Sequence, residues 1–206
     1  MNNTIPNGSL TWDNRFRQNP DLYGREPNVF FRDKLAELKP GKLLLPCEGE
    51  GRNAVWAAKQ GWAVFAFDYS RVARTAALKR AAEANVNIHY ALANPRNYGF
   101  PGAPYNGAAL IYAHLPMPER RLLIEGIGQR LKKDGLIIVE AFSPRQLAAG
   151  NPSGGPRTEE LLYTVEDTQS LFADFDILEL EETEVTLHEG AGHEGIGYVV
   201  RCVARC

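Results

Sequence analysis

The sequence predicts an α/β protein with a doubly wound, mostly parallel sheet that closes with an antiparallel C-terminal hairpin. Three observations predict it. Strand-like and helix-like segments alternate over the first two thirds of the chain, the early strands are continuous apolar runs, and a short connection joins two strand-like segments near the end. With 206 residues the chain has the usual size of one domain, so we expect a single domain over 1–206.

The first strand is expected at 42–47, where the run KLLLPC follows Pro40-Gly41. An Ala-rich helix over 52–60 comes next, and Gly61 ends it. Ser70 is placed to cap a helix that reaches Ala84. The other elements continue the alternation, with strands at 63–67, 87–91, 108–113 and 135–142 and a helix at 118–133.

The end of the chain departs from this alternation. Residues 175–188 and 196–205 are both strand-like, and the stretch between them is too short for a crossover helix, so the two strands should be antiparallel neighbours. Residues 143–157 are rich in Gly and Pro and are open to two interpretations, a surface loop or a lid over an active site. We expect residues 1–40 to cap the domain.

Charge is unevenly distributed along the chain. Residues 1–157 carry 21 Lys or Arg against 13 Asp or Glu, whereas residues 158–195 carry 12 Asp or Glu and no Lys or Arg. The net charge of −2 argues against a general polyanion binder, and we expect no nucleic-acid partner. Asn94-Pro95-Arg96-Asn97 only faintly resembles a base-methylating motif, since position 97 lacks the aromatic residue that would stack on a flipped base.

The three cysteines, Cys47, Cys202 and Cys206, are odd in number and unsuited to a disulfide framework, and no ligand spacing indicates a metal site. The N-terminus lacks the pattern of a secretory signal, and no apolar run approaches the ~20 residues that span a bilayer. We therefore expect a cytoplasmic protein without a membrane partner.

A glycine-rich turn, Gly49-Glu-Gly51-Arg-Asn-Ala54, joins the first strand to the first helix of the alternation. Ligands of doubly wound sheets bind beyond the carboxyl ends of the strands, and glycine allows close approach of the backbone. Asp68 follows Gly49 by 19 residues and ends the second strand, where a carboxylate can accept hydrogen bonds from both hydroxyls of a ribose. Together these features predict a ligand of the adenosine type.

Two cofactor classes fit this pattern. The string G-x-G-x-x-A with Asp68 satisfies the dinucleotide fingerprint, so an NAD(P)-dependent oxidoreductase is the alternative. Three features favour S-adenosylmethionine, which has no phosphate. Glu50 would repel a pyrophosphate, the chain has no Tyr-x-x-x-Lys pair, and the closing hairpin is antiparallel.

At these residues the chain resembles the class I S-adenosylmethionine-dependent methyltransferases, and more narrowly their tellurite-resistance and thiopurine-methyltransferase-like branch. The resemblance covers nearly the whole length and includes Trp12-Asp-Asn-Arg-Phe16, Tyr23-Gly-Arg-Glu-Pro-Asn28, Gly49-Glu-Gly-Arg-Asn53, Phe67-Asp68, His114-Leu-Pro116 and the tail from Leu187 to Arg205. It implies a Rossmann-like sheet of seven strands, the last one antiparallel.

The resemblance also implies the cofactor contacts. They would come from Gly49, Gly51, Asn53, Asp68 and Tyr69, with Ala93 and Asn94 near the adenine. The chain departs from the family where Leu45 replaces the usual acidic residue and Cys47 replaces the first glycine. Backbone groups of Cys47 and Glu48 would then have to hold the methionine part of the cofactor.

Methyl transfer to a soft nucleophile needs little beyond alignment of donor and acceptor. We therefore predict a methyltransferase for a small molecule such as a thiol or a chalcogen oxyanion. A non-catalytic S-adenosylmethionine-binding protein is a further alternative. We expect a monomer.

Three residues are candidates on the substrate side. His193 and His114 could each act as a base, and Arg145 could hold an anionic substrate; a turn or surface role is the competing interpretation for all three. Trp12, Phe16 and Tyr23 would either cap the cofactor pocket or form a separate apolar cluster.

Overall fold

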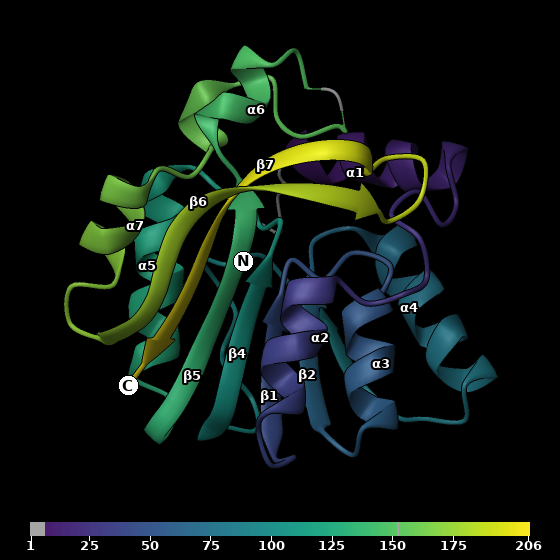
Figure 1. Ribbon diagram of the computed structural model, residues 1–206. Helices are drawn as coiled ribbons and strands as arrows, with labels where there is room; N and C mark the ends of the chain where they lie inside the picture. Colours follow the sequence, from purple (N-terminus) through teal and green to yellow (C-terminus); the bar gives the residue numbers. More distant parts are fainter. Residues whose placement is uncertain (1–6, 152) are drawn as a thin grey trace.

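A computed structural model describes residues 7–151 and 153–206, and its core is one seven-stranded sheet (Figure 1). The strand order is β3-β2-β1-β4-β5-β7-β6. The strands are β1 (Lys42–Pro46), β2 (Ala63–Asp68), β3 (His89–Leu92), β4 (Tyr105–Ile111), β5 (Leu131–Phe142), β6 (Asp176–His188) and β7 (Glu194–Arg205).

The strand directions confirm the predicted fold class. Neighbouring strands among β1 to β5 are all parallel, whereas β7 runs antiparallel to both β5 and β6. The predicted helix at 118–133 was too long, because α5 (Met117–Gly128) ends early and β5 begins at Leu131. Leu131 pairs with Tyr105 of β4, and this pairing draws residues into the strand that local helix propensity would have kept helical.

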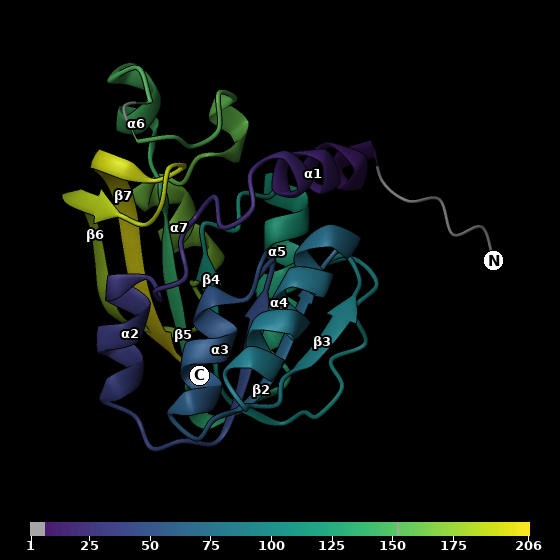
Figure 2. The ribbon, with the colours of Figure 1, turned by 90° about the vertical axis from the view of Figure 1, so that its right-hand side faces the viewer.

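Helices cover both faces of the sheet (Figure 2). Leu43 and Leu45 of β1 pack with α2 (Val29–Ala36), α3 (Arg52–Lys59) and α4 (Arg71–Glu83). Leu44 points to the other face, toward the cluster that includes α5 and α7 (Val165–Leu171). The alternation along β1 therefore explains why this strand is apolar throughout.

Two segments lie at the carboxyl end of the parallel strands, α1 (Asn7–Gln18) and the residues around α6 (Pro144–Ala148), as Figure 1 shows. Asp13 holds α1 to the start of α4: its Oδ1 accepts hydrogen bonds from Ser70 Oγ at 2.6 Å and from Val72 N at 3.2 Å. Ser70 also caps α4, as predicted, by accepting from Ala73 N.

Residues 143–151 and 153–157 are folded onto β7. The buried Gln146 donates from Nε2 to Gly154 O at 2.8 Å and to Ser153 Oγ at 3.1 Å, and its Oε1 accepts from Tyr198 N at 3.0 Å. A short 3-10 turn, η1 (Glu159–Leu161), follows. Gln146, Ser153 and Gly154 are therefore held together beside the ends of the parallel strands.

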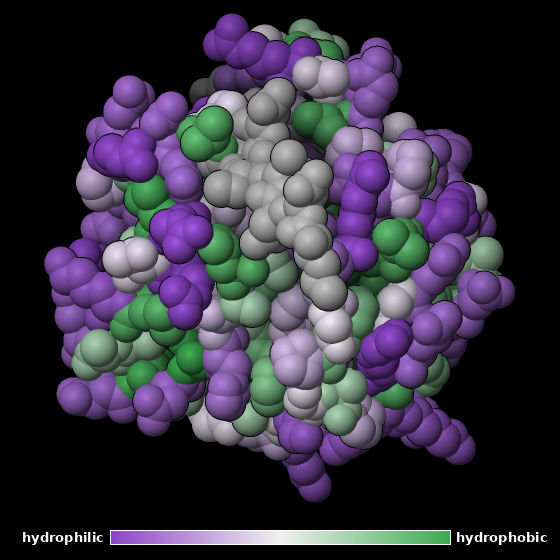
Figure 3. Space-filling view, turned by 180° about the vertical axis from the view of Figure 1, so that it is seen from behind, coloured by the Kyte–Doolittle hydropathy of each residue, from purple (hydrophilic) through white to green (hydrophobic). Residues whose placement is uncertain are grey.

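The acidic part of the chain forms α7 and the edge strand β6. Two of its carboxylates, Glu179 and Asp176, form ion pairs with Lys34 and Arg205. Figure 3 shows the molecule from behind, where hydrophilic residues cover most of the rim and hydrophobic ones lie between them. Within the described residues, no helix has the length and apolar character that crossing a membrane requires.

Candidate functional site

A cavity of about 860 Å³ lies across the carboxyl ends of the parallel strands, where doubly wound sheets bind their ligands. Its walls come from α1, the β1–α3 turn, the ends of β2 to β5, the stretch 155–157 and the β6–β7 connection. The volume lies within the range of small-molecule and cofactor sites.

The β1–α3 turn requires its two glycines for different reasons. Gly49 has φ +61° and lines the cavity, and the Tyr90 hydroxyl donates a 2.6 Å hydrogen bond to its carbonyl. Gly51 has φ +84° and is not part of the cavity wall; a Cβ there would lie 2.6 Å from Ala77 Cβ. Gly51 therefore allows α3 and α4 to approach closely, whereas Gly49 brings backbone to the ligand side.

Asp68 is buried at the end of β2 and faces the same cavity. Its Oδ2 accepts a hydrogen bond from Gly49 N at 3.1 Å, and its Oδ1 accepts from Ser70 N at 2.8 Å. Burial raises the pKa of Asp68 to about 6, although these hydrogen bonds act to lower it. The predicted pair of glycine turn and acidic residue is thus assembled in one place.

Two glutamates of the turn have defined partners. Glu48 lines the cavity and accepts a 2.7 Å hydrogen bond from Ala54 N, so its side chain caps α3 and occupies one of the free N–H groups of the helix start. Burial raises the pKa of Glu48 to about 7. The carboxylate of Glu50 lies 3.3 Å from the guanidinium of Arg80. The positive charge of Arg80 offsets the negative charge of Glu50, so the repulsion that we expected between Glu50 and a phosphate ligand is weakened.

Aromatic residues of the N-terminal segment line the cavity, as the capping interpretation requires. Trp12 stacks on Phe16 with ring centroids 5.4 Å apart, and Tyr23 meets Phe16 edge-on at 6.4 Å. Phe16 Cζ would lie 3.5 Å from a Cβ at Gly49, so this ring covers the glycine turn.

His193 lies in the wall of the cavity and is paired with a carboxylate. Its Nδ1 is 3.3 Å from Glu189 Oε2, and the same oxygen lies 2.9 Å from the guanidinium of Arg52. Burial acts to raise the pKa of Glu189, but the hydrogen bond with His193 and the charge of Arg52 lower it to about 2. Burial lowers the pKa of His193, so its ring is neutral at pH 7 beside an ionised carboxylate.

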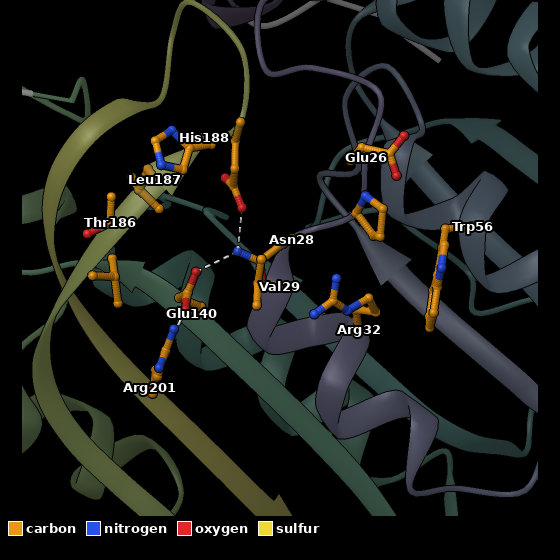
Figure 4. A pocket seen from close by; sticks show the side chains of 13 residues that line it. Glu26, Asn28, Val29, Arg32, Trp56, Glu140, Thr186, Leu187, His188 and Arg201 are labelled. Carbon is orange, nitrogen blue, oxygen red and sulfur yellow. Dashed lines mark hydrogen bonds and ion pairs between the residues drawn. The ribbon is translucent and has the colours of Figure 1, made fainter.

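A second pocket of about 530 Å³ lies on the other side of this pair, between α2 and the β6–β7 hairpin (Figure 4). Asn28, the N-cap of α2, donates from Nδ2 to Glu189 Oε1 at 2.9 Å and to Glu140 Oε1 at 2.5 Å. Arg201 in turn lies 2.7 Å from Glu140 Oε2. A chain of buried polar groups therefore links the His193 wall to the N-terminal segment.

His114 follows β4 and also lines the cavity. Its Nδ1 lies 2.9 Å from Leu161 O, and since a carbonyl can only accept, the ring hydrogen is on Nδ1. Burial lowers the pKa of His114 to about 3, and its Nε2 has no hydrogen-bond partner among the described residues. At neutral pH this ring is therefore a hydrogen-bond acceptor and a weak base.

Three predicted residues lie outside the cavity wall, and Gly51, described above, is one of them. Arg145 stacks its guanidinium over Tyr198 at 4.5 Å, so the structure gives no support for a substrate contact. Ala93 contributes indirectly, since its N–H donates to Asp68 O at 3.0 Å. The other predicted cofactor residues, including Cys47, Asn53, Tyr69 and Asn94, line the cavity.

Arg52, Glu189 and Tyr112 belong to the site but were not predicted from the sequence. Arg52 stands inside the quoted glycine string and Glu189 beside His193, but no spacing rule indicates that they pair. Tyr112 directly follows β4 with φ +53° and donates from its hydroxyl to Glu140 Oε1 at 3.0 Å. A non-glycine residue in this backbone conformation cannot be recognised from sequence alone.

Known proteins share a domain model and a fold with this chain. Residues 45–135 match the family model of a methyltransferase domain, and no curated protein matches the sequence. A structure described for the conversion of a disulfide bond into a thioacetal group during echinomycin biosynthesis has a TM-score of 0.74 and 15% identity, with 96% of this chain and 92% of that chain covered.

Two further structures share the fold. TehB from Haemophilus influenzae has a TM-score of 0.71 and 16% identity, covering 94% of this chain and 66% of that chain. Magnesium protoporphyrin IX methyltransferase from Synechocystis PCC 6803 was solved with bound S-adenosylhomocysteine. It has a TM-score of 0.67 and 17% identity, with 96% of this chain and 94% of that chain covered.

The described residues have the fold of S-adenosylmethionine-dependent methyltransferases, and residues 45–135 match the model of a methyltransferase domain. The predicted enzyme class and its cofactor, S-adenosylmethionine, are thereby confirmed. The likeness to TehB is one of fold and does not assign the chain to the tellurite-resistance branch.

Proposed function

We propose that this protein transfers the methyl group of S-adenosylmethionine to a small molecule bound in the 860 Å³ cavity. One observation carries the proposal. The buried carboxylate of Asp68 and the backbone of Gly49 lie together on the cavity wall, at the strand ends where an adenosine-type ligand binds.

The residues present fit the cofactor. Asp68 would hold the ribose, Tyr69 and Asn94 border the part of the wall beside it, and Cys47 and Gly49 would face the methionine part. S-adenosylmethionine is positively charged, and the carboxylates of Glu48 and Asp68 in this wall complement that charge. When bound, it supplies an activated methyl group.

The acceptor would bind on the side of Tyr112 and His193, at the ends of β4 and β5. Trp12 and Phe16 from one side and residues 155–157 from the other border the cavity, which favours a small acceptor over a macromolecule. A thiol or another soft nucleophile would need little more than alignment. His193, neutral and held by Glu189, is the group best placed to accept a proton from it.

Calorimetric titration with S-adenosylhomocysteine tests the cofactor site. The wild-type protein should bind in the micromolar range, and Asp68→Ala should bind at least tenfold more weakly, because the ribose loses a charged hydrogen-bond acceptor. Asp33→Ala, which removes an exposed carboxylate on α2, is the matched control and should bind as wild type does.

Equal binding by wild type and Asp68→Ala would remove the ribose assignment. Release of S-adenosylhomocysteine in the presence of thiols and oxyanions then tests turnover. Tight binding without release for any acceptor would favour a non-catalytic binding protein.

A further inference from the structure

We propose that Asn28 is a positioning residue for His193: its side-chain amide holds Glu189 in the place that fixes the tautomer of the His193 ring. This inference rests on the proposed function, in which His193 accepts the proton of the methyl acceptor. Asn28 is not part of the 860 Å³ cavity and lines the second pocket instead, so it acts on His193 through another residue.

The groups around Asn28 determine which way its amide points. Oδ1 accepts a hydrogen bond from Phe31 N at 2.9 Å and so caps α2. Nδ2 donates to Glu140 Oε1 at 2.5 Å and to Glu189 Oε1 at 2.9 Å (Figure 4). With the amide reversed, its oxygen would face two carboxylates and its NH2 group would face an N–H donor. Both hydrogens of Nδ2 are therefore committed to the two carboxylates.

Each of these carboxylates holds one ring of the cavity wall. Glu189 Oε2 lies 3.3 Å from His193 Nδ1, and Glu140 Oε1 accepts from the Tyr112 hydroxyl at 3.0 Å. The two rings meet edge-on, with their centroids 4.4 Å apart. Asn28 is therefore linked to both rings, in each case through a single carboxylate.

Asn28 also keeps two buried carboxylates close together. Glu140 is 1% exposed and Glu189 is 7% exposed, and Nδ2 lies less than 3 Å from an oxygen of each. Arg201 and Arg52 balance the two charges at the other oxygen, Oε2, of each carboxylate. Without the amide, the two Oε1 atoms would lose their shared donor and would repel each other in a buried site. The position of Glu189 therefore depends on Asn28.

The tautomer of His193 follows from the position of Glu189. An ionised carboxylate can only accept, so the hydrogen of the neutral ring lies on Nδ1 and Nε2 keeps its lone pair. His193 lines the cavity, so this lone pair is the one that can take the proton of an acceptor. Once Glu189 moves away, the hydrogen can settle on Nε2, and that lone pair is lost.

The test uses two variants that affect helix caps differently. Asn28→Ser keeps a side-chain oxygen that can cap α2 and adds no charge, but its single hydroxyl cannot donate to two carboxylates. Thr164→Ala removes the cap of α7, which accepts from Asp167 N at 3.0 Å, and is the control for a general loss of stability. Thr164 lies outside both pockets.

Proton–nitrogen correlation spectra of the histidine rings report the tautomer, because a ring nitrogen with a hydrogen and one without resonate far apart. The spectra are recorded on the ligand-free protein at pH 8, where histidine of ordinary pKa is neutral. The spectrum of His193→Asn identifies the signals of His193 among those of the four histidines.

Wild type and Thr164→Ala should both carry the His193 hydrogen on Nδ1. In Asn28→Ser the share of the tautomer with the hydrogen on Nε2 should rise about tenfold, the change in equilibrium that the loss of one hydrogen bond to a charged group brings. An unchanged tautomer in folded Asn28→Ser overturns the proposal, and so does an equal change in Thr164→Ala.

If Asn28→Ser does not fold, the wild-type protein decides. Protonation of His193 should shift the resonances of the Asn28 Nδ2 hydrogens, because Glu189 lies between the two groups. The same shift should be absent over the same pH range in His193→Asn. Asn28 resonances that do not respond to His193 overturn the proposal.

Calorimetric binding of S-adenosylhomocysteine separates this proposal from the proposed function. Asn28→Ser should bind it as wild type does, because Asp68 and Gly49 are unchanged. Failure of the wild type to bind would contradict the proposed function, whereas the tautomer is measured without ligand and decides the role of Asn28 by itself.

Discussion

Arg52 and Glu189 form a buried ion pair, 2.9 Å between the guanidinium and the carboxylate, in the wall that separates the two pockets. Both side chains are less than a tenth exposed. Arg52 begins α3 and Glu189 follows β6, so the pair joins the cofactor half of the molecule to its acidic half. The basic part of the sequence, residues 1–157, and its acidic part, residues 158–195, are therefore in contact at the site.

Glu189→Gln should lower the free energy of unfolding by about 3–5 kcal/mol, because Arg52 would remain buried without its counter-charge. Urea denaturation at pH 7 measures the change. Glu184→Gln is the matched control on the exposed side of β6 and should alter stability by less than about 0.5 kcal/mol. Similar losses of unfolding free energy in both variants would show that the buried ion pair stabilises the protein no more than an exposed carboxylate does.

Gly51→Ala should destabilise the protein more than Gly61→Ala does. Both glycines have φ near +85°, at +84° and +89°, so the backbone strain is shared. Only at Gly51 would the new Cβ clash, because it would lie 2.6 Å from Ala77 Cβ; at Gly61 the nearest atom, Pro40 Cβ, lies at 3.8 Å, an ordinary contact distance. Thermal or urea denaturation should show that Gly51→Ala lowers the free energy of unfolding by about 1–3 kcal/mol more than Gly61→Ala does. Equal losses would mean that α3 and α4 can move apart to accommodate the new methyl group at no cost.

Most of the sheet was predictable because its signals are local. The apolar run of β1, the glycine turn and the short β6–β7 connection each act within about ten residues, and all three predictions agree with the structure. The boundary between α5 and β5 was wrong because the strand's start at Leu131 depends on pairing with Tyr105, far away in sequence.

The site was predictable only in part, for the same reason. Asp68 and Gly49 belong to a pattern with fixed order and spacing. By contrast, the Asn28 side chain reaches Glu140 and Glu189, more than a hundred residues further along the chain, and no sequence pattern links them. Arg145 was a candidate for its charge alone, and its guanidinium stacks on Tyr198 instead.

Asp13→Ala should loosen α1 and weaken cofactor binding. The variant removes the oxygen that accepts from Ser70 Oγ and Val72 N, so opening of α1 should become about tenfold easier. Hydrogen exchange of the α1 amides and S-adenosylhomocysteine affinity should change together. Asp13→Asn keeps an acceptor oxygen and should change both less; faster exchange with unchanged affinity would show that α1 does not cover the cofactor.

Glu48 should make the stability of the ligand-free protein depend on pH. Its pKa is raised from 4.5 to about 7 in the folded state because of burial, so the folded protein holds a proton that the unfolded chain has lost between these values. The stabilisation is complete below pH 4.5 and is lost as pH rises through about 7.

Glu48→Gln cannot titrate, yet it keeps an oxygen that can cap Ala54 N. Urea denaturation from pH 4.5 to 8 should therefore show wild type losing about 3 kcal/mol relative to Glu48→Gln. Parallel curves for the two proteins would show that Glu48 is ionised throughout. Saturating S-adenosylmethionine should move the wild-type transition to lower pH, because its positive charge favours the carboxylate form.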